Sequence, residues 1–581
     1  MSHPLPVRED IDFLLQDWLQ LDSLLAQPRF SGLDAETIGA YLDLSESLAA
    51  DVFLGHYKTA DADEPRLDGD QVRLHPPIIE ALNRYAELGL FAAGFEERLG
   101  GMGLPYLACS AGFVYFAAAN VATAAYPMLT TANARLIATF GTPAQVEQFS
   151  APQIEGRWFG TMCLSEPQAG SYLADVRTTA VPDGEDELGP RFRLTGNKMW
   201  ISGGDQDASE NIIHLVLAKT PGENGQLPAG TRGLSLFIAP KWLPDGRRND
   251  ISVAGLNHKM GYRGTANCLL NFGEKGGAVA WRVGEAGHGL RQMFLMMNEA
   301  RIGVGIGAAA LAYRGYRHAL GYAQERVQGA DASGRPLPII AHPDVRRMLL
   351  AQKVYAEGAM ALCLYAAALV DRHDDPDAQE LLALLTPIAK TWSSEYGLLA
   401  NDLAIQVHGG YGYTRDFDVE QLYRDNRLNP IHEGTTGIQG LDLLGRKLAG
   451  AAPGLSVLQA RIADTVARAR SNEALAPLAG QLEDAWSRIL AALEIGRGLP
   501  DGRRLANATL FLRAFGHGVV AWLWLDKALA ADASARSPDF IAGKRHACRF
   551  MFEQELPQID AWLKPFVEDS TAATAIPDAA F

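Results

Sequence analysis

Apolar residues recur every three or four positions through much of the first 155 residues, a spacing that predicts amphipathic helices. The pattern is clear in DIDFLLQDWLQLDSLL (10–25) and LDAETIGAYLDLSESLAADVFL (33–54), and it returns between 76 and 155. The intervening DADEPRLDGDQVR (61–73) is polar and contains Pro and Gly, which predicts a loop. We therefore expect a helical extension over residues 1–75 and a helical domain over 76–156.

The pattern changes near residue 157 to short runs rich in β-branched and aromatic residues. Gly, Pro, Asn and Asp separate these runs, as they do between strands. The runs are RFRLTGNKMWISG, NIIHLVLAKT, GLSLFIAP, CLLNFG and GAVAWRVG. The acidic segment PDGEDELGP predicts a hairpin loop between the first strands. We expect a central β domain, a barrel or sandwich, over residues 157–284.

Helical spacing resumes at 285 and continues to 449, in three long stretches typical of a four-helix bundle. GAAPG (450–454) predicts a linker, and the remaining residues, 450–581, are again helical in pattern. The sequence thus predicts an α+β multidomain fold. A helical domain, a β domain and a helical bundle follow one another, and an additional helical domain lies at the C-terminal end.

Composition narrows the class of protein. The chain has 581 residues, 48% of them hydrophobic and 21% charged, which is ordinary for globular domains. A net charge of −16 argues against non-specific nucleic-acid binding, which depends on Lys and Arg. Five widely spaced cysteines without a CxxC pair fit a reducing compartment. The acidic N-terminus does not resemble a signal peptide, and charges interrupt the Ala-rich stretches. We expect a cytoplasmic protein without a membrane span.

Several common chemical motifs are absent or out of place. GVGIGAAA (303–310) matches a dinucleotide fingerprint, but it lies inside a helical pattern, where small residues allow close helix packing. The histidines do not form HExxH, so we expect no metal site. There is no GxSxG elbow and no P-loop.

Four segments carry more information: MCLSEPQAGS (162–171), NKMWISGG (197–204), the helical stretch from NEAR (298–301) to Arg326, and QVHGGYGYTRDFDVEQLYRDNRLNPIHEGTTGIQ (406–439). Taken singly, each also fits a bland role: a turn, a core Trp200, or a helix C-cap at HGGYGY. Together, in this order, they resemble the acyl-CoA dehydrogenase family over residues 75–450. The added helices at both ends are similar to a large bacterial branch that includes 3-methylmercaptopropionyl-CoA dehydrogenases and long-chain fatty acyl-CoA dehydrogenases.

The resemblance implies FAD as cofactor and assigns contacts to it. The first segment would surround the flavin, with Ser165 near its N5 atom. Ser171 would also lie near the CoA portion of the substrate. Relatives usually have Asp where this chain has Tyr172, so this turn departs from the family pattern. The implied contacts in the β domain are Met162, Leu164, Ser165, Gly170, Ser171, Trp200, Ile201 and Ser202.

A second set of implied FAD contacts lies in the helical bundle. Arg326 matches an arginine that crosses a subunit interface to the pyrophosphate of a neighbouring FAD, a role that suits a guanidinium. Gln406, Gly409 and Gly410 match a loop near the adenosine of that FAD. Thr435 and Gln439 match further cofactor contacts. A shared FAD implies at least a dimer, and we expect a homodimer.

Glu433, in IHEGTTGIQ, matches the family's catalytic base. Some relatives place the base on a helix instead, at the position of Ala300 here. Glu299 is one residue earlier and would point about 100° around the helix. The implied substrate contacts are Ser171, Asn298, Arg301, His432 and Gly434. Arg301 also fits a bundle-core ion pair, and His432 a hydrogen-bonded core histidine.

The resemblance implies α,β-dehydrogenation of a saturated fatty acyl-CoA, of medium or long chain, to trans-2-enoyl-CoA in β-oxidation. Electrons would pass to an electron-transferring flavoprotein. Two alternatives stay within the family: a dehydrogenase of a short thioester such as 3-methylmercaptopropionyl-CoA, and an acyl-CoA oxidase. A third is a DNA-binding relative with a basic C-terminal region. Residues 451–581 hold 14 basic and 15 acidic residues, which disfavours that class.

Overall fold

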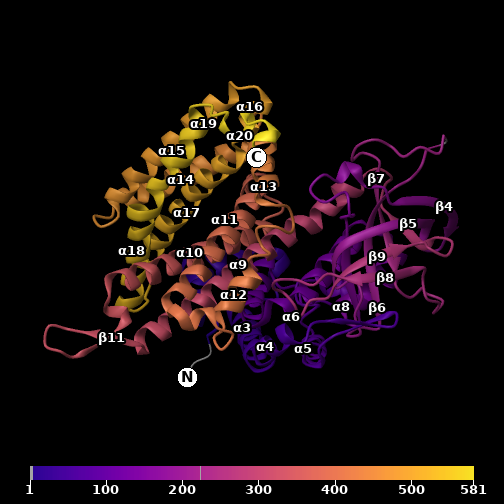
Figure 1. The fold of residues 1–581 in the computed structure, drawn as a ribbon, viewed down its shortest axis with the longest axis horizontal. Coiled ribbons are helices and arrows are strands. Elements are labelled where there is room, and N and C mark those ends of the chain that lie inside the picture. Colours follow the sequence, from indigo (N-terminus) through magenta and orange to yellow (C-terminus); the bar gives the residue numbers. More distant parts are fainter. Residues whose placement is uncertain (1–3, 223) are drawn as a thin grey trace. The chain divides into compact units, whose positions relative to one another are not determined.

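The computed structural model describes residues 4–222 and 224–581, and the chain forms two compact units (Figure 1). One unit combines Met1–Thr37 with Val304–Phe581, and the other contains Ile38–Gly303. Helix α9 (Gly289–Glu325) passes from one unit into the other. Each unit has hydrophobic clusters of its own, such as one around Leu236 in the Ile38–Gly303 unit and one around Val407 in the other.

Helices precede the sheet in the Ile38–Gly303 unit. The central one, α6 (Tyr106–Phe140), is buried on nearly all sides, as expected for a helix that is apolar all round. Its helical geometry is interrupted at Asn120, where φ is −159° and ψ is 89°. The other helices of this part are α3 (Ala35–Leu48), α4 (Tyr57–Ala62), α5 (Pro76–Glu87), α7 (Pro143–Gln145) and α8 (Ala151–Ile154).

The segment 61–73, expected to be a loop, contains a small antiparallel hairpin of β1 (Arg66–Asp68) and β2 (Gln71–Arg73). Gly69 supplies the positive φ of its turn, +65°. All three residues of β1 are exposed, so no apolar alternation marked it as a strand. The loop prediction was wrong for these residues.

The sheet of this unit has eight strands in the order β10-β7-β6-β4-β5-β9-β8, and β3 pairs with β6. Because β10 also pairs with β5, the path closes on itself. The strands are β3 (Trp158–Cys163), β4 (Thr179–Asp186), β5 (Gly189–Ser202), β6 (Asn211–Lys219), β7 (Leu234–Pro240), β8 (Ile251–Leu256), β9 (Asn267–Phe272) and β10 (Ala278–Val283).

Two local features of β5 matter for the site. The acidic segment contains a hairpin turn, with Asp186 opposite Gly189, but only Glu187 and Leu188 lie between the strands, and the rest of the predicted loop belongs to β4 and β5. Near its other end, the register of β5 with β9 shifts between Lys198 and Ile201, which is the mark of a β-bulge. A bulge re-aims the side chains that it contains, here those of Met199 and Trp200.

Long helices dominate the other unit. After α9 come α10 (Pro343–Val370) and α11 (Pro376–His408), then the short α12 (Val419–Asn426) and α13 (Thr436–Asp442). An exposed hairpin of β11 (Val327–Ala330) and β12 (Pro336–Pro338) joins α9 to α10. The C-terminal helices are α14 (Pro453–Arg470), α15 (Ala476–Arg497), α16 (Asp501–Ala506), α17 (Ala508–Ala533), α18 (Pro538–Phe550), α19 (Ile559–Val567) and α20 (Ala572–Ala575). The predicted α+β multidomain fold is confirmed.

The N-terminal helices α1 (Arg8–Asp12) and α2 (Leu21–Leu25) belong to the same unit as the C-terminal helices. Trp18 donates through Nε1 to Asp526 Oδ2 at 2.8 Å. Lys544 lies 2.5 Å from Asp10 and 2.7 Å from Glu357 of α10, and this cluster is buried. The N-terminal and C-terminal helices are therefore joined through buried and partly buried polar contacts.

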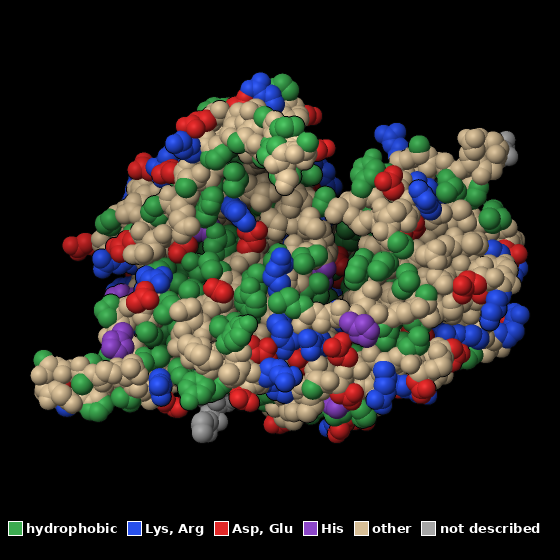
Figure 2. All heavy atoms as spheres, in the orientation of Figure 1, with side chains coloured by type: hydrophobic (Ala, Val, Ile, Leu, Met, Phe, Trp, Pro, Cys, Tyr) green, Lys and Arg blue, Asp and Glu red, His purple; other side chains and the backbone are tan. Residues whose placement is uncertain are grey.

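Four helices of the described residues, α6, α9, α10 and α17, are long and apolar enough to cross a membrane by length and composition. Between 72% and 89% of their most apolar windows is buried inside the protein. The face in Figure 2 shows Lys and Arg intermixed with Asp and Glu, including over the C-terminal helices. This mixture fits the near-zero charge of residues 451–581.

Candidate functional site

Trp200 lies in the bulge of β5 with φ +65°, in the left-handed region that disfavours non-glycine residues. Its side chain is 58% exposed, so it is not the core aromatic that the sequence also allowed. Its neighbour Ile201 is buried, and Ser202 Oγ accepts a bond of 3.3 Å from Asn267 Nδ2. Strained backbone that presents a large apolar ring to the surface is a common feature of binding sites.

The segment 162–171 lies directly beside this bulge. Strand β3 ends at Cys163, and the chain then turns tightly, since Glu166 and Ala169 exchange both backbone hydrogen bonds. Met199 N donates to Ser165 O at 3.0 Å, which joins the two segments. The structure therefore joins the two segments that hold the predicted cofactor residues of the β domain: Met162, Leu164, Ser165, Gly170, Ser171, Trp200, Ile201 and Ser202.

Two predicted substrate residues lie on α9 within this unit. Asn298 is exposed, whereas Arg301 is buried. Glu299, the helix carboxylate considered as an alternative base, lies 3.4 Å from Arg135 Nε. Burial raises the pKa of Glu299, and the arginine opposes that rise. Glu299 therefore takes part in a partly buried ion pair between α6 and α9.

Glu433 lies in the loop between α12 and α13, in the other unit. Its φ is +53°, and that of Gly434 is +91°. Gln439 Nε2 donates to Glu433 O at 3.0 Å, and Thr435 caps α13 by accepting from Ile438 N at 3.4 Å. The side chain of Glu433 is half-buried. The loop thus holds one carboxylate in an unusual backbone conformation.

Lys390 of α11 was missed by sequence reasoning and holds the same loop. Its Nζ donates to Gly434 O at 2.6 Å, and its side chain is buried. His432 Nε2 lies 3.0 Å from Asn429 Oδ1. Burial, with the nearby Lys390, lowers the pKa of His432 to about 3, so the imidazole is neutral at pH 7. A single lysine inside an apolar helical pattern was the only signal for Lys390.

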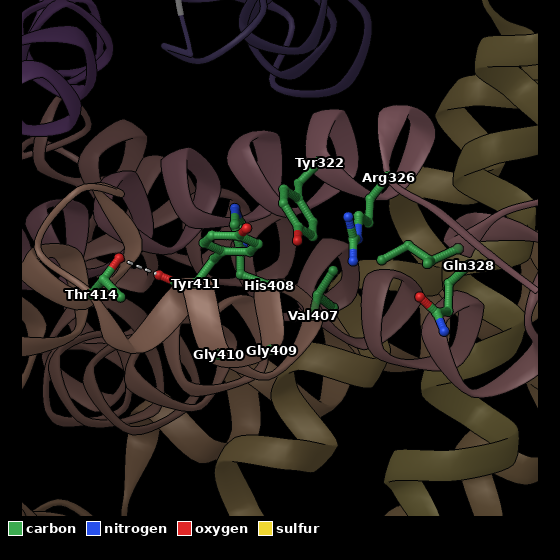
Figure 3. A pocket seen from close by; sticks show the side chains of 10 residues that line it. Tyr322, Arg326, Gln328, Val407, His408, Gly409, Gly410, Tyr411 and Thr414 are labelled. Atoms are coloured by element: carbon green, nitrogen blue, oxygen red, sulfur yellow. Dashed lines mark hydrogen bonds between the residues drawn. The ribbon is translucent and has the colours of Figure 1, made fainter.

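A cavity of about 510 Å³ lies where α9 and α11 end (Figure 3). Its lining includes Arg326, Gly409 and Gly410, and a Cβ added at either glycine would meet nothing within 4 Å. His408 stacks on Tyr322 with ring centroids 4.4 Å apart. HGGYGY does end a helix, since α11 stops at His408 and Gly409 takes φ +60°.

The predicted bundle residues thus fall into two places. Arg326, Gly409 and Gly410 line the cavity, and Gln406 is exposed on the last turn of α11. Thr435 and Gln439 belong to the loop of Glu433 instead. Gln439 Oε1 is buried without a hydrogen-bond partner among residues 4–222 and 224–581.

These residues fit a flavin dinucleotide. The exposed indole of Trp200 offers a flat apolar surface to an aromatic ring system. The cavity offers a guanidinium for phosphate, aromatic rings, and open glycine backbone that a ligand can approach closely. The unpartnered Oε1 of Gln439 can accept a hydrogen bond from a bound group. No group of three or more His, Cys, Asp or Glu within the described chain is placed to hold a metal ion.

The chain is similar to known proteins over most of its length. Four family models match: "Acyl-CoA dehydrogenase, N-terminal domain" at 63–157, "Acyl-CoA dehydrogenase, middle domain" at 161–274, "Acyl-CoA dehydrogenase, C-terminal domain" at 287–448, and "Acetyl-CoA dehydrogenase C-terminal like" at 458–577. The chain is 33% identical to the 3-methylmercaptopropionyl-CoA dehydrogenase of Ruegeria pomeroyi, with 92% of each chain covered. It is 32% identical to a broad-specificity linear acyl-CoA dehydrogenase of Mycobacterium tuberculosis, with 96% of each covered.

Solved structures show the same fold at lower identity. An acyl-CoA dehydrogenase of Bacillus anthracis complexed with FAD is similar with a TM-score of 0.76 and 20% identity, covering 98% of this chain and 93% of that one. ACDH-11 of Caenorhabditis elegans in complex with C11-CoA has a TM-score of 0.75 and 20% identity, covering 99% and 97%. The chain therefore belongs to the acyl-CoA dehydrogenase family of FAD-dependent oxidoreductases.

Proposed function

We propose that the protein converts a saturated acyl-CoA to the trans-2-enoyl-CoA, with Glu433 as the base that removes the α-proton. The observation that carries this proposal is the loop geometry around Glu433. Its backbone has a positive φ, Gln439 binds its carbonyl oxygen, and Lys390 binds the next one. A strained conformation persists only where its surroundings fix it, and such residues cluster at reactive sites.

The chemistry explains why a base needs such support. The α-proton of a thioester is weakly acidic, so the carboxylate must be aimed at it and partly removed from water. The half-burial of Glu433 and its fixed backbone support such a role. The backbone N–H of Glu433 can donate to the thioester oxygen as negative charge develops there. FAD, when bound, accepts the hydride that leaves the β-carbon.

The proposed FAD site has two parts on this chain. Ser165 and Trp200 would contact the flavin, and their segments are joined by the Met199–Ser165 hydrogen bond. Arg326 and the open glycines of the cavity would bind the pyrophosphate and adenosine of an FAD held by a second copy, so we propose a homodimer. Arg326→Ala should then weaken FAD binding about tenfold and lower the dimer fraction in sedimentation velocity.

The proposed substrate is a medium- or long-chain fatty acyl-CoA, in β-oxidation. The relative named for broad linear acyl-CoA specificity supports it. A second candidate is a short thioester, supported by the 33% identical 3-methylmercaptopropionyl-CoA dehydrogenase. One methylene changes discrimination by only about 1–3 kcal/mol, so a broad preference suits either case. We propose an electron-transferring flavoprotein as acceptor and the cytoplasm as location.

The test is an anaerobic titration of the FAD-loaded protein with acyl-CoAs of four to eighteen carbons and with 3-methylmercaptopropionyl-CoA. We expect the flavin absorbance to bleach with some of these, and the chain length that bleaches it best identifies the substrate class. Glu433→Gln should abolish bleaching while FAD remains bound. Bleaching that persists in Glu433→Gln, or bound FAD that no thioester reduces, would overturn the proposal. Rapid reoxidation by O₂ would instead favour the oxidase.

A further inference from the structure

Lys198 and Glu166 form a buried ion pair beneath the two segments proposed to contact the flavin. The Lys198 side chain is fully buried, and that of Glu166 is 3% exposed. Lys198 Nζ donates to Glu166 Oε1 and to the backbone oxygen of Leu164, both at 2.9 Å. One ammonium on β5 thus reaches the residue just before Ser165 and the residue just after it.

Glu166 extends this contact to the far end of the loop. Its Oε2 accepts from Arg177 N at 2.8 Å, and its Oε1 accepts from Thr178 N at 3.0 Å. The Thr178 hydroxyl donates to Oε1 as well, at 2.5 Å. The carboxylate therefore joins the start of the loop 164–178 to its end, directly before β4 begins at Thr179.

Regular secondary structure does not fix the conformation of this loop. Strand β3 ends at Cys163, so the loop has no sheet ladder to fix it. On the other side, the register of β5 breaks after Lys198, and Trp200 takes φ +65°. Lys198 is the last residue of β5 in regular register with β9 before this break. The pair lies where two irregular segments meet.

A buried ion pair seldom adds net stability, because taking both charges out of water costs about as much as their attraction returns. Separating the two charges is nevertheless costly in free energy, because each charge would then be buried and unpaired. The pair therefore favours the one loop conformation that keeps the charges together. Burial alone would lower the pKa of Lys198 and raise that of Glu166; their attraction opposes both shifts. The pair is thus suited to fixing loop geometry.

We propose that Lys198 and Glu166 are positioning residues for the flavin: they hold the Ser165 turn and the Trp200 bulge in one geometry before FAD binds. This rests on the proposed assignment of Ser165 and Trp200 to the flavin site. Neither Lys198 nor Glu166 is expected to contact FAD in this role. Their effect is therefore on cofactor affinity and on the flavin's surroundings, which can be measured without substrate.

The test compares Lys198→Met with Lys241→Met, a matched control. Lys241 is also a buried lysine of this unit, and its Nζ lies 2.9 Å from Asp205 Oδ1. FAD dissociation constants are measured by flavin fluorescence on apoprotein, together with the visible circular dichroism and midpoint potential of the bound flavin. We expect Lys198→Met to weaken FAD binding about tenfold to a hundredfold, the range for residues that orient the direct ligands of a metal. Lys241→Met should change it less than threefold.

Equal melting-temperature losses in both variants, with FAD affinity, circular dichroism and potential unchanged, would overturn the proposal. If Lys198→Met does not fold, Glu166→Gln takes its place, since it keeps the shape and removes the charge. Trp200→Ala distinguishes the assignment of Trp200 to the flavin site from the positioning role of Lys198. Unchanged FAD affinity in Trp200→Ala overturns the flavin-site assignment itself, whereas a loss there with none in Lys198→Met overturns only the positioning role. Glu433→Gln should bind FAD normally and report on catalysis alone.

Discussion

Lys544→Met should destabilise the unit that contains both chain ends. Lys544 of α18 contacts Asp10 of α1 at 2.5 Å and Glu357 of α10 at 2.7 Å, and its side chain is 4% exposed. These contacts link the N-terminal helix, the bundle and the C-terminal helices. Methionine preserves the length of the side chain and removes the charge, so the variant isolates the ion pairs.

The loss of unfolding free energy in Lys544→Met depends on which charges stay buried without a partner. Breaking a buried ion pair by removing one partner costs about 3–5 kcal/mol, because the other charge stays buried. In Lys544→Met, Glu357 keeps its contact with Lys353, while Asp10 loses its direct ammonium partner. Asp10→Asn should cost less, because Lys544 still faces Glu357. We expect the order Lys544→Met, then Asp10→Asn, then wild type, from least to most stable.

Urea unfolding followed by tryptophan fluorescence measures this order, with hydrogen exchange over residues 4–30 as a local readout. Burial opposes ionisation of Asp10 and Glu357, but the neighbouring lysines outweigh it and lower both pKa values. A lowered carboxyl pKa contributes stability at neutral pH that is lost as the pH falls below about 4. The difference in unfolding free energy between wild type and Lys544→Met should therefore become smaller in acid. A loss below 1 kcal/mol at pH 7, or equal losses in Lys544→Met and Asp10→Asn, would refute the reasoning.

Three further predictions concern single contacts. Lys390→Met should slow flavin reduction by acyl-CoA at least tenfold in anaerobic stopped flow, because Gly434 O loses its 2.6 Å donor; an unchanged rate would contradict this. Gly409→Val should weaken FAD binding, since φ +60° with ψ −137° is a conformation that side chains avoid at a cost of order 1–3 kcal/mol, and titration with FAD checks it. His517→Phe should lower the urea midpoint by leaving Trp392 Nε1, which donates to His517 Nδ1 at 3.0 Å, buried and unpaired at a cost of about 1–3 kcal/mol. An unchanged midpoint would argue that water replaces the imidazole.

The long helices could be predicted from the sequence, but the small hairpins could not. Helices α9, α10 and α11 have 37, 28 and 33 residues, long enough for apolar spacing to stand out. Strands β1 and β11 are exposed along their whole length, so no alternation marks them. The closure of the sheet depends on β10 pairing with β5, and strands so far apart in sequence show no local sign of their pairing.

The residues of the candidate site could likewise be predicted only in part. Segments such as SEPQAGS and HEGTT could be singled out because several unusual residues stand together in each. Lys198 and Lys390 could not, since each stands in an element that has other charged residues and looks like one more surface residue in the linear pattern. Both are fully buried, and each donates to a backbone oxygen of a loop distant in sequence. Only the fold brings a lysine to a particular carbonyl.

Lys198 and Lys390 stabilise an irregular loop in the same way, one in each unit. A loop that carries a reactive group or a cofactor contact leaves the regular ladder, so its carbonyl groups lose their usual donors. At Trp200 and Glu433 the backbone also has a positive φ, which costs of order 1–3 kcal/mol and relaxes unless its surroundings hold it. A buried ammonium can donate up to three hydrogen bonds and is costly to leave unpaired, so it penalises every arrangement except the one that satisfies it. Lys198 acts so on Leu164 O, and Lys390 on Gly434 O. The precision of each loop therefore comes from a residue outside it.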